Sequence, residues 1–204
     1  DEGAAAGAAI THFRPHQIDD AGEAKGEADQ RFTEAMQFAR DAGDRRTLSI
    51  VLSNLGDVAL WRGEYDEAGQ RLDEAVSLSR ALGDRRGESL TLTSLGTLAV
   101  YRSDFTAASN YFEQSLQHFR ELNDPPSVAA LLVNLADALR HIGEPDRAEP
   151  LCAEAFDIAH ELNSRSLMAI ALNIKGRLRF DRGDLENAQA LLAQSLCARL
   201  AGLR

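Results

Sequence analysis

The stretch NLGDVALWRGEYDEA, residues 54–68, combines the apolar spacing of an α-helix with unexpectedly small residues. Gly56 lies inside an apolar pattern formed by Leu52, Leu55 and Ala59, which is typical of an amphipathic helix. Glycine inside a helix costs about 1 kcal/mol relative to alanine. We therefore expect Gly56 to lie where two helices cross closely, because a larger side chain would hold them apart.

The same pattern returns every forty residues along most of the chain. A gapless alignment joins GEYDEAGQRLDEAVSLSRALGDRR (63–86), SDFTAASNYFEQSLQHFRELNDPP (103–126), GEPDRAEPLCAEAFDIAHELNSRS (143–166) and GDLENAQALLAQSLCARLAGLR (183–204). Small residues recur in three registers: Gly56, Gly96, Ala136 and Gly176; Ala28, Ala68, Ala108, Ala148 and Ala188; and Ala35, Ala75, Ser115, Ala155 and Ser195. Such self-similarity is the signature of stacked repeat units that share one core.

Each unit is predicted to contain two helices, so the predicted fold class is all-α. The predicted repeat domain covers 23–204, with a second helix at 27–42 and helix pairs at 45–82, 85–122, 125–162 and 165–200. N-caps are expected at Asp44, Asp84, Asp124 and Ser164.

Two segments depart from the regular pattern. Residues 1–22 do not continue the register, and we expect an irregular or partial N-terminal helix there. Pro150 falls inside a predicted second helix and lacks a backbone N–H, so we expect a kink or a late helix start.

These units resemble the tetratricopeptide repeat (TPR), which carries small residues at its eighth, twentieth and twenty-seventh positions and an aromatic residue near its seventeenth. Tyr65 and Phe105 match the aromatic position, whereas Pro145 and Leu185 depart from it. The usual period is 34 residues, so the second helices here carry about six more. The resemblance implies a right-handed superhelical solenoid of antiparallel helix pairs, with the first helices on its concave side.

Composition excludes several classes of protein. The net charge of −10 argues against a nucleic-acid partner, because phosphate binding needs clustered Lys and Arg. Two cysteines are too few for a disulfide scaffold, and no apolar run is long enough to span a membrane. The N-terminus does not have the features of a signal peptide, and it does not begin with an initiator Met. We therefore expect a processed chain or an excised fragment of cytoplasmic origin.

The resemblance also implies which side chains face a ligand. The positions concerned lie on the first helices: Asn54, Asp57, Trp61, Ser94, Thr97, Tyr101, Asn134, Asp137, His141, Asn173 and Arg177. Among them, Asn54, Ser94 and Asn134 form a polar ladder that could hold an extended peptide backbone, since a carboxamide offers both donors and an acceptor. The alternative is that these side chains cap or bond a neighbouring helix.

Trp61, Tyr101 and His141 form a stripe of rings in the same register. Such rings can anchor an apolar ligand side chain, or they can pack against the following second helix as ordinary core. Charges of both signs accompany them: Asp57, Asp137, Arg140, Arg177 and Asp181. This set lacks the Lys and Arg residues that clamp a C-terminal carboxylate in some co-chaperones, and mixed charge is often only a solvated face.

Catalysis finds little support in the sequence. His12 and His16 have the spacing of a metal pair, but Pro15 interrupts the helix that would align them. His141 lies one turn from Asp137, and a surface salt bridge is a simpler reading of that pair than a catalytic one. Cys152 occupies a core position, Cys197 an exposed one, and no phosphate loop is present. We therefore predict no enzyme activity, no metal and no cofactor.

The expected function is binding of a peptide or partner protein in the concave groove. The units resemble the repeat regions of large bacterial regulators that combine a STAND-type ATPase with a LuxR-type helix-turn-helix, which implies a sensor or interaction arm. Repeats longer than usual also occur in kinesin light chains and in peptide-sensing bacterial regulators, and the resemblance does not select among these families. The alternative is a structural spacer or an oligomerisation arm. The last predicted helix leaves apolar residues uncovered, which suggests a homodimer through this end: Leu191, Leu192, Leu196 and Leu200.

Overall fold

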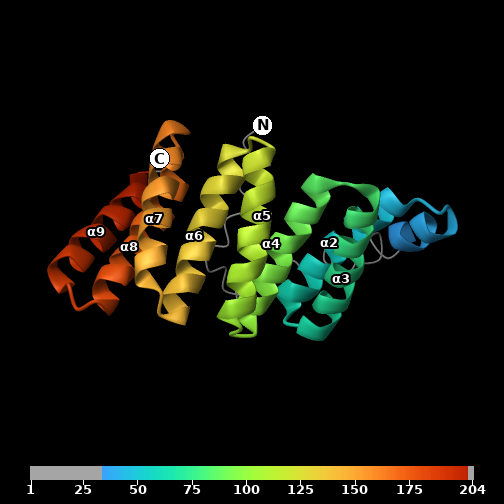
Figure 1. Ribbon diagram of the computed structural model, residues 1–204, viewed down its shortest axis with the longest axis horizontal. Helices are drawn as coiled ribbons and strands as arrows, with labels where there is room; N and C mark the ends of the chain where they lie inside the picture. Colours follow the sequence, from blue (N-terminus) through green and yellow to red (C-terminus); the bar gives the residue numbers. More distant parts are fainter. Residues whose placement is uncertain (1–33, 202–204) are drawn as a thin grey trace. The chain divides into compact units, whose positions relative to one another are not determined.

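The computed structural model describes residues 34–201, and the regular structure within that range is entirely helical. Residues 34–41 are helical and precede eight longer helices (Figure 1). These are α2 (Arg45–Arg62), α3 (Tyr65–Leu82), α4 (Arg85–Tyr101), α5 (Phe105–Glu121), α6 (Pro125–Ile142), α7 (Pro145–Glu161), α8 (Arg165–Asp181) and α9 (Leu185–Ala201). The irregular N-terminal helix expected at 1–22 lies outside the described residues.

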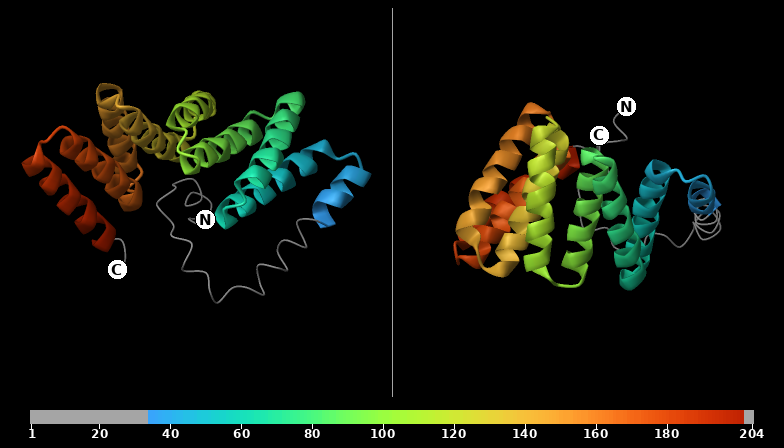
Figure 2. Two further views of the ribbon diagram at one scale, coloured as in Figure 1. Left: turned by 90° about the horizontal axis from the view of Figure 1, so that it is seen from below. Right: turned by 45° about the vertical axis from the view of Figure 1, so that its right-hand side comes forward.

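The chain divides into two compact units, an N-terminal unit described over 34–103 and a C-terminal unit described over 104–201. In the N-terminal unit α3 packs against α2 and α4, and α2 also contacts α4. In the C-terminal unit α5 to α9 pack in sequence, and α6 contacts α8. Within each unit, consecutive helices run antiparallel, as two further views show (Figure 2). The predicted all-α arrangement of antiparallel helix pairs is thus confirmed.

Capping side chains start the first helix of each pair. Asp44, Asp84 and Asp124 each accept a hydrogen bond from the backbone N–H three residues on, and Ser164 does the same for α8. Each bond satisfies one of the four N–H groups that the first helical turn leaves unpaired. The four predicted N-caps are confirmed, and Asp104 and Asp184 cap α5 and α9 in the same way.

A residue with a left-handed backbone conformation follows the end of each helix up to α8, at intervals of twenty positions. These residues are Gly43, Gly63, Gly83, Ser103, Asn123, Gly143, Asn163 and Gly183. Glycine adopts this conformation without a steric penalty, and asparagine tolerates it better than other side chains do. Ser103, with φ of 60°, is the member of the series that is neither glycine nor asparagine.

Replacing Ser103 by glycine should therefore stabilise the protein. We expect the free energy of unfolding to rise by about 0.5–1 kcal/mol, because the left-handed conformation costs a residue with a Cβ about that much or more. Urea denaturation followed by circular dichroism measures the change. Ser77→Gly, inside α3, is the matched control and should destabilise by a similar amount.

Two of the glycines identified in the sequence, Gly56 and Gly176, lie where helices within a unit cross. A Cβ added at Gly56 would come within 2.6 Å of Leu72 Cγ, and one at Gly176 within 2.9 Å of Leu192 Cγ. In the pair α6 and α7, Ala136 occupies the position of these glycines and Cys152 the position of these leucines. The residue on α6 is therefore larger than glycine, and the residue on α7 is smaller than leucine.

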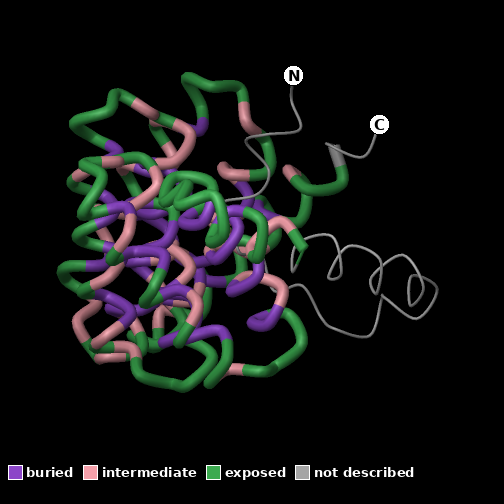
Figure 3. The backbone as a smooth tube through the Cα atoms, turned by 90° about the vertical axis from the view of Figure 1, so that its right-hand side faces the viewer, coloured by how far each residue is buried: buried purple, intermediate pink, exposed green. Residues whose placement is uncertain are grey.

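Buried serines form further hydrogen bonds between the two helices of a pair. In the pair α2 and α3, Ser49 Oγ donates to the Ala75 carbonyl at 3.0 Å and lies 2.8 Å from Ser79 Oγ. In the pair α8 and α9 the hydroxyl lies on the opposite helix, and Ser195 Oγ donates to the Ala169 carbonyl at 2.7 Å. Figure 3 marks the buried positions along the backbone, to which these serines belong.

Pro150 does not delay its helix. The structure begins α7 at Pro145 and continues it through Pro150, so the expected late start is wrong. Proline lacks one N–H, and at the sixth residue of a helix its loss leaves one first-turn carbonyl, that of Asp146, without an intrahelical partner. Burial of Ala148 and Cys152 on either side of Pro150 keeps this part of the helix packed.

Candidate functional site

The predicted ligand-facing residues lie on the first helices of the pairs, α2 and α4 in the N-terminal unit and α6 and α8 in the C-terminal unit. We call the surface that they form in each unit its first-helix face. Because α2 contacts α4 and α6 contacts α8, each unit has a continuous face of two helices.

The face of the N-terminal unit exposes a carboxamide and two rings. Asn54 is exposed on α2, and Trp61 follows two turns later with 68% of its surface accessible. On α4, Tyr101 is 42% exposed and stacks on Tyr65, with the ring centroids 5.7 Å apart. Trp61 and Tyr101 are therefore presented at the surface and are not ordinary core.

Two hydroxyl residues of this face already interact with other groups of the same unit. Thr97 is buried and donates its hydroxyl to the Thr93 carbonyl at 2.9 Å, so it is not presented to a ligand in this conformation. Ser94 is half-buried, lies 3.5 Å from the Leu90 carbonyl, and donates a hydrogen bond to the Asp57 carboxylate. Asn54 is thus the open member of the polar ladder in this unit.

Asp57 is the charged group of this face. Burial raises the pKa of its carboxyl above the usual 3.8, and the hydrogen bond from Ser94 only partly offsets that effect. Among the described residues it forms no ion pair. A charge removed from water without a partner is destabilising.

Replacing Asp57 by asparagine should raise the free energy of unfolding by about 1 kcal/mol at pH 7. Because the folded-state pKa is raised, the charge destabilises the fold above that pKa, and the penalty disappears below the unfolded value of 3.8. The stability difference from the wild type should therefore shrink as the pH falls toward 3.8. Denaturant titrations across this range measure it. Asp73→Asn, which removes an exposed carboxylate of α3, is the matched control.

The face of the C-terminal unit is dominated by ion pairs. Arg140 has a side chain only 10% exposed, and it donates to Asp137 and to Asp181, each at 2.9 Å. Arg177 approaches Asp137 to 3.4 Å from α8. These contacts join α6 to α8, so the charges that the sequence suggested as a solvated face hold the two helices together.

His141 pairs differently from the sequence prediction. Its Nε2 accepts a hydrogen bond from Arg140 Nη2 at 2.7 Å, and its ring stacks on Phe105 with centroids 4.1 Å apart. Burial, and then the Arg140 charge, lower the pKa of His141, which favours the neutral acceptor. The expected salt bridge with Asp137 does not form, because the Arg140 guanidinium occupies the carboxylate.

The two asparagines of this face are half-buried. Asn134 Nδ2 is buried and has no hydrogen-bond partner among the described residues. Asn173 lies on α8 one turn before Arg177. Asn134 is therefore a less accessible member of the ladder than Asn54.

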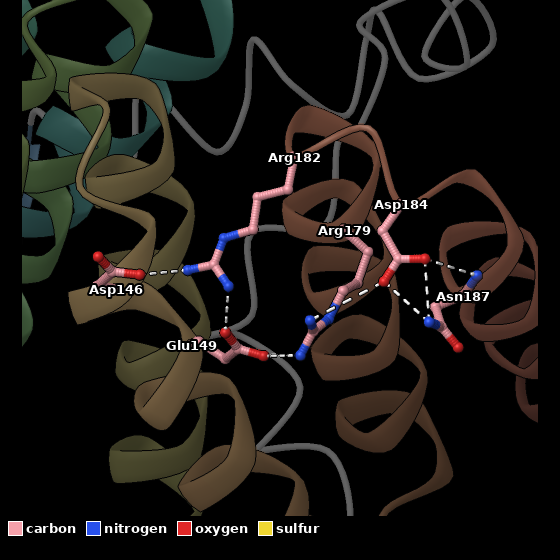
Figure 4. A network of polar contacts seen from close by, with 6 residues as sticks. All are labelled: Asp146, Glu149, Arg179, Arg182, Asp184 and Asn187. Carbon is pink, nitrogen blue, oxygen red and sulfur yellow. Dashed lines mark hydrogen bonds and ion pairs between the residues drawn. The ribbon is translucent and has the colours of Figure 1, made fainter.

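A further polar network connects α7 to α8 outside the predicted site (Figure 4). Arg182 contacts Asp146 and Glu149, while Arg179 contacts Glu149 and, at 4.0 Å, Asp184. Arg102 pairs with Asp66 in the equivalent place two repeat periods earlier. The same interval relates the pairs Arg40–Glu74 and Arg120–Glu154. Each charge of this network is thus paired, and the pairs connect neighbouring helices at the surface.

The two cysteines should react very differently with thiol reagents. Cys152 is 1% exposed, and burial raises the pKa of its thiol to about 12, whereas Cys197 is exposed on α9. The thiolate is the reactive form, so we expect one thiol per folded chain to react rapidly at pH 8. Titration with a chromogenic disulfide reagent measures the number, and denatured chain should give two. Cys197→Ser should abolish the rapid reaction.

Other classes of site find no support in the part of the chain that the structure describes. No group of three or more His, Cys, Asp or Glu residues could hold a metal ion there. Within 34–201 no helix is both long and apolar enough to cross a membrane. The pair His12 and His16 lies outside the described residues.

Comparison with known proteins places the repeat in a family. The protein-family model of the MalT-like TPR region matches residues 27–198 of the sequence. No curated protein matches the chain.

Solved structures share the fold at low sequence identity. BtubC (BKLC) from P. vanneervenii superposes with a TM-score of 0.80 at 19% identity, covering 91% of this chain and 77% of its own. A candidate kinesin light chain from Podosopora anserina with nearly identical TPR-like repeats gives a TM-score of 0.67 at 18% identity. That match covers 94% of this chain and 99% of the other.

Proposed function

The chain belongs to the MalT-like TPR region family, and on that basis we propose that it binds a peptide or a segment of a partner protein on its first-helix faces. TPR regions are generally protein-interaction modules, and repeat regions of this kind are typically non-catalytic. The proposal is therefore a binding role, without metal or cofactor.

The arrangement of the N-terminal unit is the observation that carries this proposal. Asn54 is open to hydrogen bonding, and Trp61 and Tyr101 present their rings on the same face. Exposed Trp and Tyr residues are enriched among the side chains that contribute most to binding. In the C-terminal unit, Asn134, Asp137, His141, Asn173 and Arg177 form the corresponding face, with its charges already paired.

We also propose the setting in which the module works. The family name and the resemblance to bacterial regulators support an interaction or sensor arm of a larger regulatory protein, acting in the cytoplasm. The net charge of −10 makes direct contact with nucleic acid unfavourable, so the arm would act through its protein partner.

Carboxamide removal on the first-helix faces tests the proposal. A partner identified by crosslinking is purified, and its affinity is measured by isothermal titration against the chain carrying Asn54→Ala and Asn134→Ala. We expect weaker binding, by about tenfold, because two hydrogen bonds to the ligand backbone are lost. Gln70→Ala with Asn110→Ala, exposed carboxamides on second helices, should leave the affinity unchanged. If the wild type and the two double variants bound the partner with equal affinity, the polar ladder would not contribute to binding.

A second candidate function is self-association through α9. Leu185, Leu196 and Leu200 are more than half exposed, and an open apolar hollow of about 470 Å³ lies beside Leu196 and Phe180. Exposed apolar surface of this kind favours a protein contact. Light scattering should show a dimer that Leu196→Glu converts to a monomer. A wild-type chain that is monomeric at high concentration would exclude this function.

A further inference from the structure

Asp57 and Asp137 occupy equivalent positions of α2 and α6, two repeat periods apart. Within the part of the chain that the structure describes, only Asp137 has a cation partner. Asp137 contacts the guanidinium groups of Arg140 and Arg177. Among the described residues, Asp57 receives a hydrogen bond from Ser94 and no contact from Lys, Arg or His. The N-terminal unit therefore contains a partly buried carboxylate whose charge is not compensated by any residue within 34–201.

Neighbouring side chains give this carboxylate the surroundings of a cation site. Trp61 lies one helical turn after Asp57 on the same side of α2, since residues four apart share a helix face. Ser94 connects Asp57 to α4, where Tyr101 follows two turns later with its ring partly exposed. An aromatic face attracts a cation through its quadrupole, and the attraction increases when water is excluded.

Stability gives an independent reason to assign a role to Asp57. An uncompensated, partly buried charge is destabilising, and asparagine could keep the hydrogen bond with Ser94 without that penalty. Residues that destabilise the unbound protein in this way are concentrated at binding and catalytic sites. A ligand cation would supply the charge that α6 and α8 supply to Asp137 from within the chain.

We propose that the first-helix face of the N-terminal unit binds a cationic side chain, arginine or lysine, of the partner segment. Asp57 neutralises the charge, and the rings of Trp61 and Tyr101 contact the stem and the head of the bound side chain. This inference rests on the proposed function, because it specifies the ligand of the same face. The net charge of −10 attracts such a segment from a distance.

Trp61 is the only tryptophan of the chain, so its fluorescence reports directly on this site. The probes are blocked pentapeptides of alanine whose central residue is arginine, lysine, citrulline, leucine or glutamate. Citrulline is the matched probe, because it keeps the shape of arginine without its charge. We expect the arginine peptide to bind about tenfold more tightly than the citrulline peptide.

Asp57→Asn should remove this preference by lowering the affinity for the arginine peptide to that for the citrulline peptide. Asp73→Asn removes one negative charge from α3 and should preserve the preference, which controls for long-range attraction. Equal binding of arginine and citrulline peptides by the wild type, or a preference that survives in Asp57→Asn, would overturn the inference while leaving peptide binding intact. Fluorescence that no peptide changes would contradict both the inference and the proposed function.

Discussion

Replacing Gly56 by alanine should lower the free energy of unfolding by about 1–3 kcal/mol, although alanine is the better helix former. The added Cβ would lie 2.6 Å from Leu72 Cγ and 2.7 Å from Leu72 Cδ2. Leu72 is fully buried on α3, so its side chain cannot withdraw without displacing its own neighbours. Denaturation in urea, followed by circular dichroism at 222 nm, measures the change as a shifted midpoint.

Gly69 provides the matched control for this substitution. It also lies inside a helix, but a Cβ there would meet Leu98 Cδ2 at an ordinary 3.5 Å. Gly69→Ala should therefore be neutral or stabilise by about 0.5–1 kcal/mol through helix propensity alone. If Gly56→Ala were as harmless as Gly69→Ala, the close crossing of α2 and α3 would not explain the glycine.

The chain suggests a compensating substitution for Gly56→Ala. Where α6 has Ala136 in the glycine register, α7 has Cys152 in place of the leucine. Leu72→Cys alone should destabilise, because it leaves a cavity next to Gly56. Combined with Gly56→Ala, it should cost at least about 1 kcal/mol less than the sum of the two single effects. Additive effects would show that the two positions do not share the same space.

The fold could be predicted because its determinants recur locally and at a fixed interval. Gly56 and Gly176 mark crossings that the structure places against Leu72 and Leu192, and Asp44 begins its helix as a local capping pattern requires. Pro150 was misleading, because a single missing N–H near a helix start is tolerated when the helix is packed on both sides of it.

The candidate site was less predictable because side-chain pairing depends on distant residues. The spacing of His141 and Asp137 suggested a salt bridge, but Arg140 lies close to both and holds Asp137 together with Asp181 of α8. The stacking of His141 on Phe105 joins two different helices, and the local spacing of residues in the sequence does not predict such a contact. Thr97 shows the same limit, since its register position faces the ligand side in related repeats while its side chain is buried here.

Removing the ring of Trp61 should have the largest effect on partner binding. We expect Trp61→Ala to weaken the affinity of the identified partner by about thirtyfold, which is the 2 kcal/mol typical of a tryptophan hot spot. The side chain is 68% exposed in the free chain, so its removal should change the free energy of unfolding by less than about 0.5 kcal/mol. Isothermal titration measures the affinity, and urea denaturation confirms that the variant is folded.

Phe38 is the matched control for Trp61, because it is a 75% exposed aromatic residue of the helix at 34–41, which is not one of the first helices. Phe38→Ala should bind the partner like the wild type. Trp61→Phe should retain most of the affinity, since a smaller ring still offers an apolar face. If Phe38→Ala lost affinity while Trp61→Ala kept it, the partner would contact the second helices, and the first-helix face would not be the binding surface.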